Sequence, residues 1–162
     1  MLPIRPRIEG FSYLGLHRYS LIICTNNRKQ VFSDVEIVAR VLAIIRQCAA
    51  AHEFAVLAYC FMPDHVHLVV SAVSDASDLR TFMSRWKQRS GYEHRQRTGS
   101  HLWQPSYFDH VLRDDEQTGR AVRYVLENPV RKGLAVEFAD YRFSGSDVFT
   151  AEELREFWHR KG

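Results

Sequence analysis

The chain has 162 residues, 46% of them apolar and 25% charged, with a formal net charge of only +3. This size and composition suit one globular domain spanning 1–162. No apolar run approaches the ~20 residues that cross a bilayer, and 1–7 lacks a signal-peptide core, so no membrane partner is expected. Cys24, Cys48 and Cys60 lack CxxC spacing, which predicts buried free thiols and a cytoplasmic location.

Four short strands and two long helices are predicted in the first two thirds of the chain. The strands are expected at 19–25, 54–61, 65–70 and 107–112. The first helix is expected to begin at a capping box formed by Ser33 and Glu36 and to run to about Ala51, and the second is expected to run from Ser77 or Asp78 to about Tyr92.

The remaining segments predict two further helices around an irregular stretch. Acidic residues 114–116 suit the start of a third helix, which Pro129 is expected to stop at about Glu127. The segment 138–149 has no clear pattern, and a second capping box, at Thr150 and Glu153, opens a short helix. The order β-α-β-β-α-β followed by helices predicts an α+β, ferredoxin-like fold with an antiparallel sheet. Both long helices should cover one sheet face and leave the other free for ligands.

The most informative stretch is His65-Val66-His67, which follows a Pro63-Asp64 turn. Side chains alternate faces along a strand, so His65 and His67 share one face, about 7 Å apart. Two imidazoles so placed can bind one divalent metal. Taken alone, the pair is also compatible with two surface histidines on a half-exposed strand.

Tyr124 and Asn128 lie four residues apart on the third helix and therefore share a face. The Asn128 carbonyl oxygen can ligate a hard cation, and the Tyr124 phenol becomes a nucleophile when its phenolate is stabilised. With the histidine pair, this set suits metal-assisted attack on a phosphodiester. Spacing alone leaves the ordinary alternatives open: a packed tyrosine and an asparagine that ends a helix.

A nearly acid-free basic stretch runs from 80 to 104. Its cations neutralise phosphates, and aromatic rings stack on bases, which indicates a polyanionic partner. Phe82, Met83 and Trp86 follow a helical stripe typical of a core, so Tyr92 and Trp103 are the better candidates for nucleic-acid contact. The predicted DNA-binding residues are Arg85, Lys87, Arg89, Arg95, Arg97 and Trp103.

Two blocks of sequence carry a resemblance to a known family. The first is Tyr59-Cys60-Phe61-Met62-Pro63-Asp64-His65-Val66-His67, and the second is Arg123-Tyr124-Val125-Leu126-Glu127-Asn128-Pro129-Val130-Arg131. Together they resemble the single-tyrosine HUH transposases, above all the REP-associated tyrosine transposases. The segments 26–30, 86–89, 102–109 and 140–146 add to the likeness, which covers roughly residues 17–149.

The resemblance implies that His65, His67 and Asn128 hold a divalent metal, Mg²⁺ or Mn²⁺. It implies that Tyr124 attacks single-stranded or hairpin DNA, forming a 5′-phosphotyrosine link and a free 3′-hydroxyl. The implied partners are palindromic-repeat hairpins and, in some relatives, a second copy in a homodimer, whereas the REP-associated branch is expected to act as a monomer. The expected location is the bacterial cytoplasm, in association with the nucleoid.

Two positions depart from the pattern of the REP-associated branch. Asp64 stands where that branch has Asn, and Glu127 adds an acid beside Asn128.

The sequence also allows three alternative interpretations of these residues. A histidine-triad hydrolase is disfavoured because Val69 occupies the third histidine position. A zinc site with His101 or His110 lacks suitable ligand spacing. A domesticated, non-catalytic binder of hairpin nucleic acid is the main alternative, against which the intact Tyr124 argues.

Overall fold

The computed structural model describes residues 10–160; 1–9 and 161–162 lie outside the described residues, including the stretch considered above for a signal peptide. A five-stranded sheet has the order β4-β1-β3-β2-β5, and its strand pairs are antiparallel. The strands are β1 (Arg18–Cys24), β2 (Phe54–Met62), β3 (His65–Ala72), β4 (Phe108–Leu112) and β5 (Ser144–Gly145). The order of β1 to β4 confirms the predicted ferredoxin-like arrangement, and β5 extends it.

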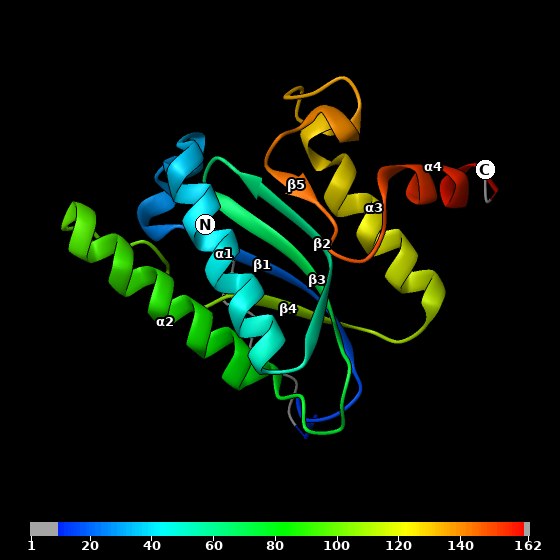
Figure 1. Ribbon diagram of the computed structural model, residues 1–162, viewed down its shortest axis with the longest axis horizontal. Coiled ribbons are helices and arrows are strands. Elements are labelled where there is room, and N and C mark those ends of the chain that lie inside the picture. Colours follow the sequence, from blue (N-terminus) through cyan, green and yellow to red (C-terminus); the bar gives the residue numbers. More distant parts are fainter. Residues whose placement is uncertain (1–9, 161–162) are drawn as a thin grey trace.

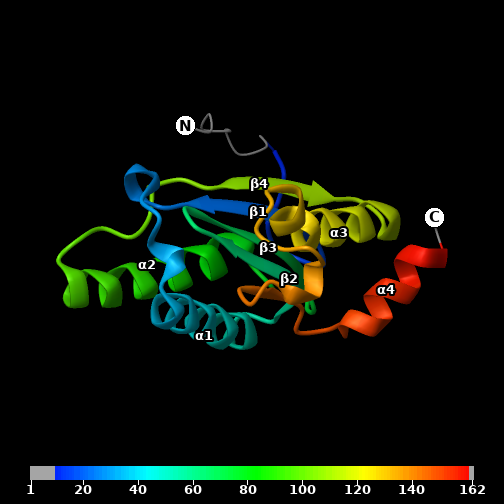
Figure 2. The same ribbon diagram turned by 90° about the horizontal axis from the view of Figure 1, so that it is seen from above.

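Four α-helices accompany the sheet within residues 10–160: α1 (Val35–Ala51), α2 (Leu79–Thr98), α3 (Asp115–Arg131) and α4 (Ala151–Arg160). In Figure 1, α1 and α2 lie together, well apart from α3 and α4, and Figure 2 shows the same separation from above. No helix in the described part of the chain is both long and apolar enough to span a bilayer.

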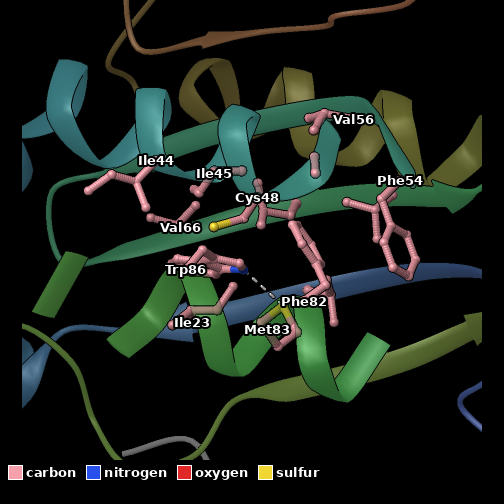
Figure 3. Packing of buried hydrophobic residues seen from close by; sticks show 14 of the residues in the cluster. Ile23, Ile44, Ile45, Cys48, Phe54, Val56, Val66, Phe82, Met83 and Trp86 are labelled. Carbon is pink, nitrogen blue, oxygen red and sulfur yellow. Dashed lines mark hydrogen bonds between the residues drawn. The ribbon is translucent and has the colours of Figure 1, made fainter. Parts of the chain in front are cut away.

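The face of the sheet under α1 and α2 holds the larger core. Phe82, Met83 and Trp86 of α2 are fully buried there against strand residues such as Val66, as Figure 3 shows. The Trp86 indole N–H donates to the Met83 sulfur at 3.2 Å. The predicted helical stripe is therefore core, and both long helices do cover one face.

The opposite face is not free, which corrects the expectation from the sequence. Val122, Val125 and Leu126 of α3 are buried there with strand residues that include Val69. The hydrophobic side of α3 removes this apolar surface from water. The helix thereby lies against the same sheet face as His65 and His67. The three cysteines are free and buried, as expected.

Helices α1 and α2 begin or end at other residues than predicted, because a neighbouring residue caps the free backbone groups at the helix end. Asp34, not Ser33, caps α1, since its Oδ1 accepts from the amides of Glu36 and Ile37 at 2.9 and 3.3 Å. Asp78 caps α2, which continues past Tyr92 until Gly99, in the left-handed region at φ +75°.

The end of α3 contradicts the predicted stop before Pro129. The helix continues to Arg131 with Pro129 inside its last turn. Leu134 N donates to the Pro129 carbonyl at 2.8 Å and Gly133 N to the Val130 carbonyl at 3.0 Å. With Gly133 at φ +73°, this is a Schellman end that satisfies the last carbonyls. The box at Thr150 and Glu153 is confirmed by reciprocal bonds of 2.8 and 3.1 Å.

Candidate functional site

The β2–β3 hairpin aims the two histidine rings at each other. Met62 pairs with His65 across the two-residue Pro63-Asp64 turn, and the alternation of β3 puts both rings on the α3 face. Their Nε2 atoms are 3.1 Å apart. Two nitrogens that each lie about 2.1 Å from one metal are separated by roughly 3 to 3.5 Å, so this spacing fits a shared cation.

Both imidazoles are held in the neutral form that binds metal. His67 is 5% exposed, and burial, followed by the charges of His65 and Arg131, lowers its pKa to about 3. Burial also lowers the pKa of His65, although the Asp64 carboxylate opposes that shift. Since burial disfavours the charged ring, neither imidazole has to give up a net positive charge before it binds a metal at neutral pH.

Asp64 contacts His65 directly. Its Oδ1 lies 2.6 Å from His65 Nδ1, and its Oδ2 accepts from Arg28 Nε at 3.0 Å. Burial raises the pKa of Asp64, but the hydrogen bonds from His65 and Arg28 lower it by more than burial raises it. The pKa of this carboxyl therefore lies below its usual value. An ionised carboxylate can only accept, so His65 carries its proton on Nδ1 and turns the Nε2 lone pair toward His67.

Tyr124 stands beside this pair in the same chain. Its ring centroid is 6.3 Å from that of His67, and the residue is 57% exposed. The Arg131 guanidinium lies over the Tyr124 ring, 3.9 Å from its centroid, and donates to the Tyr124 carbonyl at 2.5 Å. The phenol is therefore accessible from outside while the protein fixes one face of its ring.

Asn128 lies one turn further along α3 and is buried, with 4% of its surface exposed. Its Oδ1 is 3.4 Å from Arg131 Nη2. Glu127, the other acid considered for the site, instead pairs with Arg123 at 3.1 Å. The amide of Asn128 is thus placed at the helix–sheet interface, and the neighbouring carboxylate is engaged along the helix surface.

Within residues 10–160, no three His, Cys, Asp or Glu side chains gather in a way that could hold a metal ion. The alternative zinc site with His101 or His110 therefore finds no support. A metal ion at the histidine pair would need a further oxygen donor of another kind, such as an amide, water or phosphate. Neutral imidazoles with oxygen donors fit Mn²⁺ well and Mg²⁺ less well.

The predicted DNA-binding residues divide into two groups. Arg85, Arg89, Arg95 and Arg97 are exposed along α2, with Arg97 3.7 Å from Glu93. Lys87 and Trp103 instead help to build the loop after α2. Lys87 Nζ donates to the carbonyls of residues 104, 105 and 106 at 3.2 to 3.5 Å. The half-buried Trp103 packs edge-to-face against Trp86, with ring centroids 5.4 Å apart, and its indole N–H donates to the Ser90 hydroxyl at 2.9 Å.

This loop and α2 enclose a groove of about 510 Å³. Arg80 belongs to the predicted basic stretch but is not among the predicted DNA-binding residues, and His101 and Tyr107 are not predicted to contact DNA. Arg80, Lys87, Gly91 and Arg95 follow helical spacing that could have indicated a shared face. The lining residues are Arg80, Ser84, Lys87, Gln88, Gly91, Tyr92, Arg95, His101, Leu102, Trp103, Gln104, Pro105 and Tyr107.

The loop that lines the groove is bonded to the end of β1. Asn26 N donates to the Leu102 carbonyl at 2.8 Å, and Gln104 N donates to the Cys24 carbonyl at 3.0 Å. Cys24 in turn pairs with His65 in the sheet. The loop that walls the groove is therefore bonded to the strand end beside the histidines.

Two known transposases are similar to this chain in sequence. A protein of Haemophilus influenzae assigned as a REP-associated tyrosine transposase is 24% identical over 163 residues, covering 93% of this chain and 90% of the relative. The ISDra2 transposase TnpA of Deinococcus radiodurans is 29% identical over 140 residues, covering 79% of this chain and 94% of that protein.

A solved REP-associated tyrosine transposase bound to a REP hairpin has the same fold. The TM-score is 0.70 at 19% identity, with 86% of this chain and 82% of that chain covered. The family model described as IS200-like transposase matches residues 14–128, a span that contains both histidines and reaches Tyr124 and Asn128. The chain therefore belongs to the family of IS200-like transposases.

Proposed function

We propose that this transposase cuts and rejoins single-stranded DNA through Tyr124, with a divalent metal held by His65, His67 and Asn128. The observation that carries the proposal is the convergence of segments about sixty residues apart in sequence. The His67 and Tyr124 rings lie 6.3 Å apart, and the two histidine Nε2 atoms lie 3.1 Å apart. An exposed phenol beside a pair of neutral imidazoles favours a role for Tyr124 in phosphoryl transfer over a purely structural role in packing.

The reaction replaces one phosphodiester bond by another. The Tyr124 phenol oxygen bonds to the phosphorus, and the bond from phosphorus to the 3′-oxygen breaks. The phenol loses a proton and the departing 3′-oxygen takes one up, which leaves a 5′-phosphotyrosine and a free 3′-hydroxyl. Attack by a DNA 3′-hydroxyl then reverses these changes and frees Tyr124. A bound Mg²⁺ or Mn²⁺ supplies charge stabilisation at the phosphate oxygens.

The protein's own groups prepare both reactants. His65 and His67 present neutral Nε2 atoms on a strand that cannot shift without disturbing two neighbours. Arg131 over the ring restrains Tyr124 and keeps a cation beside the phenol, which gains negative charge as it loses its proton. Because Tyr124 is more than half exposed, a DNA strand can reach it without local unfolding.

We further propose that hairpin DNA lies across α2 and the adjoining groove. Four exposed arginines, Arg85, Arg89, Arg95 and Arg97, provide phosphate contacts. Tyr92, 69% exposed at the groove, offers a ring on which an unpaired base can stack. Trp103 and Lys87 act mainly by shaping the wall. The hairpin bound to the fold neighbour supports this class of partner.

The test uses the purified protein, end-labelled single strands that contain a hairpin, and Mn²⁺, analysed on a denaturing gel. Wild type should give a covalent protein–DNA band, and Tyr124→Phe should give none while still binding the hairpin. Cleavage that survives Tyr124→Phe would refute the assigned nucleophile. Tight binding with no cut strand under Mg²⁺ or Mn²⁺ would instead identify a domesticated binder.

A further inference from the structure

The Pro63-Asp64 turn is held more firmly than a two-residue hairpin requires. The Asp64 carbonyl accepts from both the amide and the hydroxyl of Thr25, each at 3.0 Å. The Pro63 carbonyl accepts from Phe32 N at 3.1 Å. These bonds come from the segment after β1 and fix the backbone from which the Asp64 side chain projects.

Arg28, the ion-pair partner of Asp64, lies in a segment with an unusual backbone conformation. Asn27 and Arg28 are consecutive non-glycine residues with φ of +54°, in the left-handed region that residues with a Cβ atom adopt only at a cost in free energy. This conformation directs Arg28 Nε to Asp64 Oδ2 at 3.0 Å, and Arg28 Nη1 also lies 3.0 Å from the Cys24 sulfur. Local strain is thus retained in a segment that holds Asp64 on one side.

The two carboxylate oxygens of Asp64 have separate partners. Oδ1 takes the Nδ1 proton of His65 at 2.6 Å, and Oδ2 takes the Nε proton of Arg28. An asparagine cannot satisfy both, because its nitrogen would face either the Arg28 donor or the protonated Nδ1 of His65. Relieving the second conflict would require the other His65 tautomer, with its proton on the Nε2 atom that faces His67.

We infer that Asp64 is a positioning residue that fixes the tautomer and orientation of His65, and that Arg28 holds Asp64 in place for this task. The inference rests on the proposed function, since it assigns the pair a metal to receive. Side chains that hydrogen-bond to a metal-ligating histidine typically contribute 10- to 100-fold to metal affinity. Asp64 is therefore matched to Arg28, and Asn at this position would suit a chain without that arginine.

The experiment measures binding of Mn²⁺ alone, without DNA, from the electron paramagnetic resonance signal of the free ion. Asp64→Asn should raise the Kd for Mn²⁺ by about 10-fold or more. Arg28→Met should have a smaller effect, and the double variant should be no weaker than Asp64→Asn, because removing Arg28 relieves the donor conflict. Full additivity of the two losses would overturn the link to Arg28.

A matched control lies elsewhere in the chain. Arg46 and Asp147 form another Arg–Asp pair, with N–O distances of 2.8 to 3.1 Å. Asp147→Asn removes a comparable ion pair without contacting His65 and should leave the Mn²⁺ Kd unchanged. A Kd that rises equally in Asp147→Asn and Asp64→Asn would show a general loss of stability and overturn the inference.

A second measurement reports which ring nitrogen of His65 carries the proton. The ¹⁵N chemical shifts of His65 should report Nδ1–H in wild type and a change of tautomer in Asp64→Asn, measured without metal. An unchanged tautomer with an unchanged Mn²⁺ Kd would overturn the positioning role while leaving the metal site intact. Wild-type protein that binds Mn²⁺ no better than His65→Ala/His67→Ala would instead refute the proposed metal site, and the inference with it.

Discussion

The two halves of the proposed site differ in how tightly the protein holds them. The histidine half lies on a central strand, with His67 5% exposed and Asp64 bonded through its carboxylate and its carbonyl. The tyrosine half lies on a helix that covers the sheet, with Tyr124 57% exposed and restrained by one arginine. This difference suggests a division of labour: a preorganised metal platform and a nucleophile open to an incoming strand.

Breaking the buried half should have the strongest effect. His67→Ala should abolish Mn²⁺ binding and lower the rate of DNA cleavage by at least about 10²-fold, because it removes one of two imidazole donors from the charge-stabilising centre. Single-turnover cleavage with saturating hairpin substrate measures the effect. A variant that keeps near wild-type cleavage would mean that His67 is only a packed core residue.

Acid should destabilise the protein through the same buried ring. The unfolded chain takes up a proton near the ordinary histidine pKa of 6.5, whereas folded His67 does so only near pH 3. Unfolded protein therefore binds more protons in this window, and the free energy of unfolding should fall as the pH drops from about 6.5, by up to ~1.4 kcal/mol per pH unit.

Urea titrations of wild type and His67→Gln at several pH values measure this acid slope. The variant should show a shallower dependence on pH, whatever its absolute stability, because its amide does not titrate. Equal slopes for the two proteins between pH 6.5 and 4 would contradict the burial of a neutral His67.

The exposed half should respond more mildly. Arg131→Met keeps the aliphatic stem but removes the charge over the Tyr124 ring and the bond to its carbonyl. Cleavage should fall about 3- to 10-fold, corresponding to a loss of roughly 1 kcal/mol. Mn²⁺ binding should not weaken, because the variant also removes a cation near His67 and the donor that lies 3.4 Å from Asn128 Oδ1. Arg120→Met, on the same helix and paired with Glu116 at 2.8 Å, is the matched control. A loss of metal affinity in Arg131→Met alone would show that the halves are not separate.

The DNA surface should show the weakest effect per residue. Arg89→Gln and Arg95→Gln, combined, should weaken hairpin binding and reduce the slope of log K against log salt by about 0.7 to 0.9 for each phosphate that is no longer neutralised. Fluorescence anisotropy at several salt concentrations measures the slope. Arg155→Gln, on α4 and paired with Glu137, should leave it unchanged; an equal change in both proteins would place the DNA elsewhere.

The sequence predicted the placement of the two histidines well, because that placement depends only on residues close together in the chain. Alternation along β3 was sufficient to put His65 and His67 on one face, and element order was sufficient for the ferredoxin-like sheet. The same patterns left the second sheet face empty. Where α3 packs depends on its apolar side meeting Val69 and its neighbours, a long-range match that no window of sequence contains.

Charge patterns predicted a surface but not the partner of each side chain. Lys87 looked like a phosphate contact, yet its ammonium is bonded to three carbonyls of the following loop. Trp103 looked like a stacking platform and is half-buried beside Trp86. The sequence predicted no role for Arg28, because only the left-handed backbone at 27–28 brings its side chain to Asp64.

If Tyr124 and the histidine pair of one chain form one site, two variants that each lack one half cannot restore each other. Mixing Tyr124→Phe with His67→Ala, each inactive alone, therefore tests the shared site, with the covalent protein–DNA band as the readout. Since both groups lie together in a single chain, we predict no band from the mixture. Recovery of the band would show that the phenol of one copy serves the histidines of another, and would refute a site built within one chain.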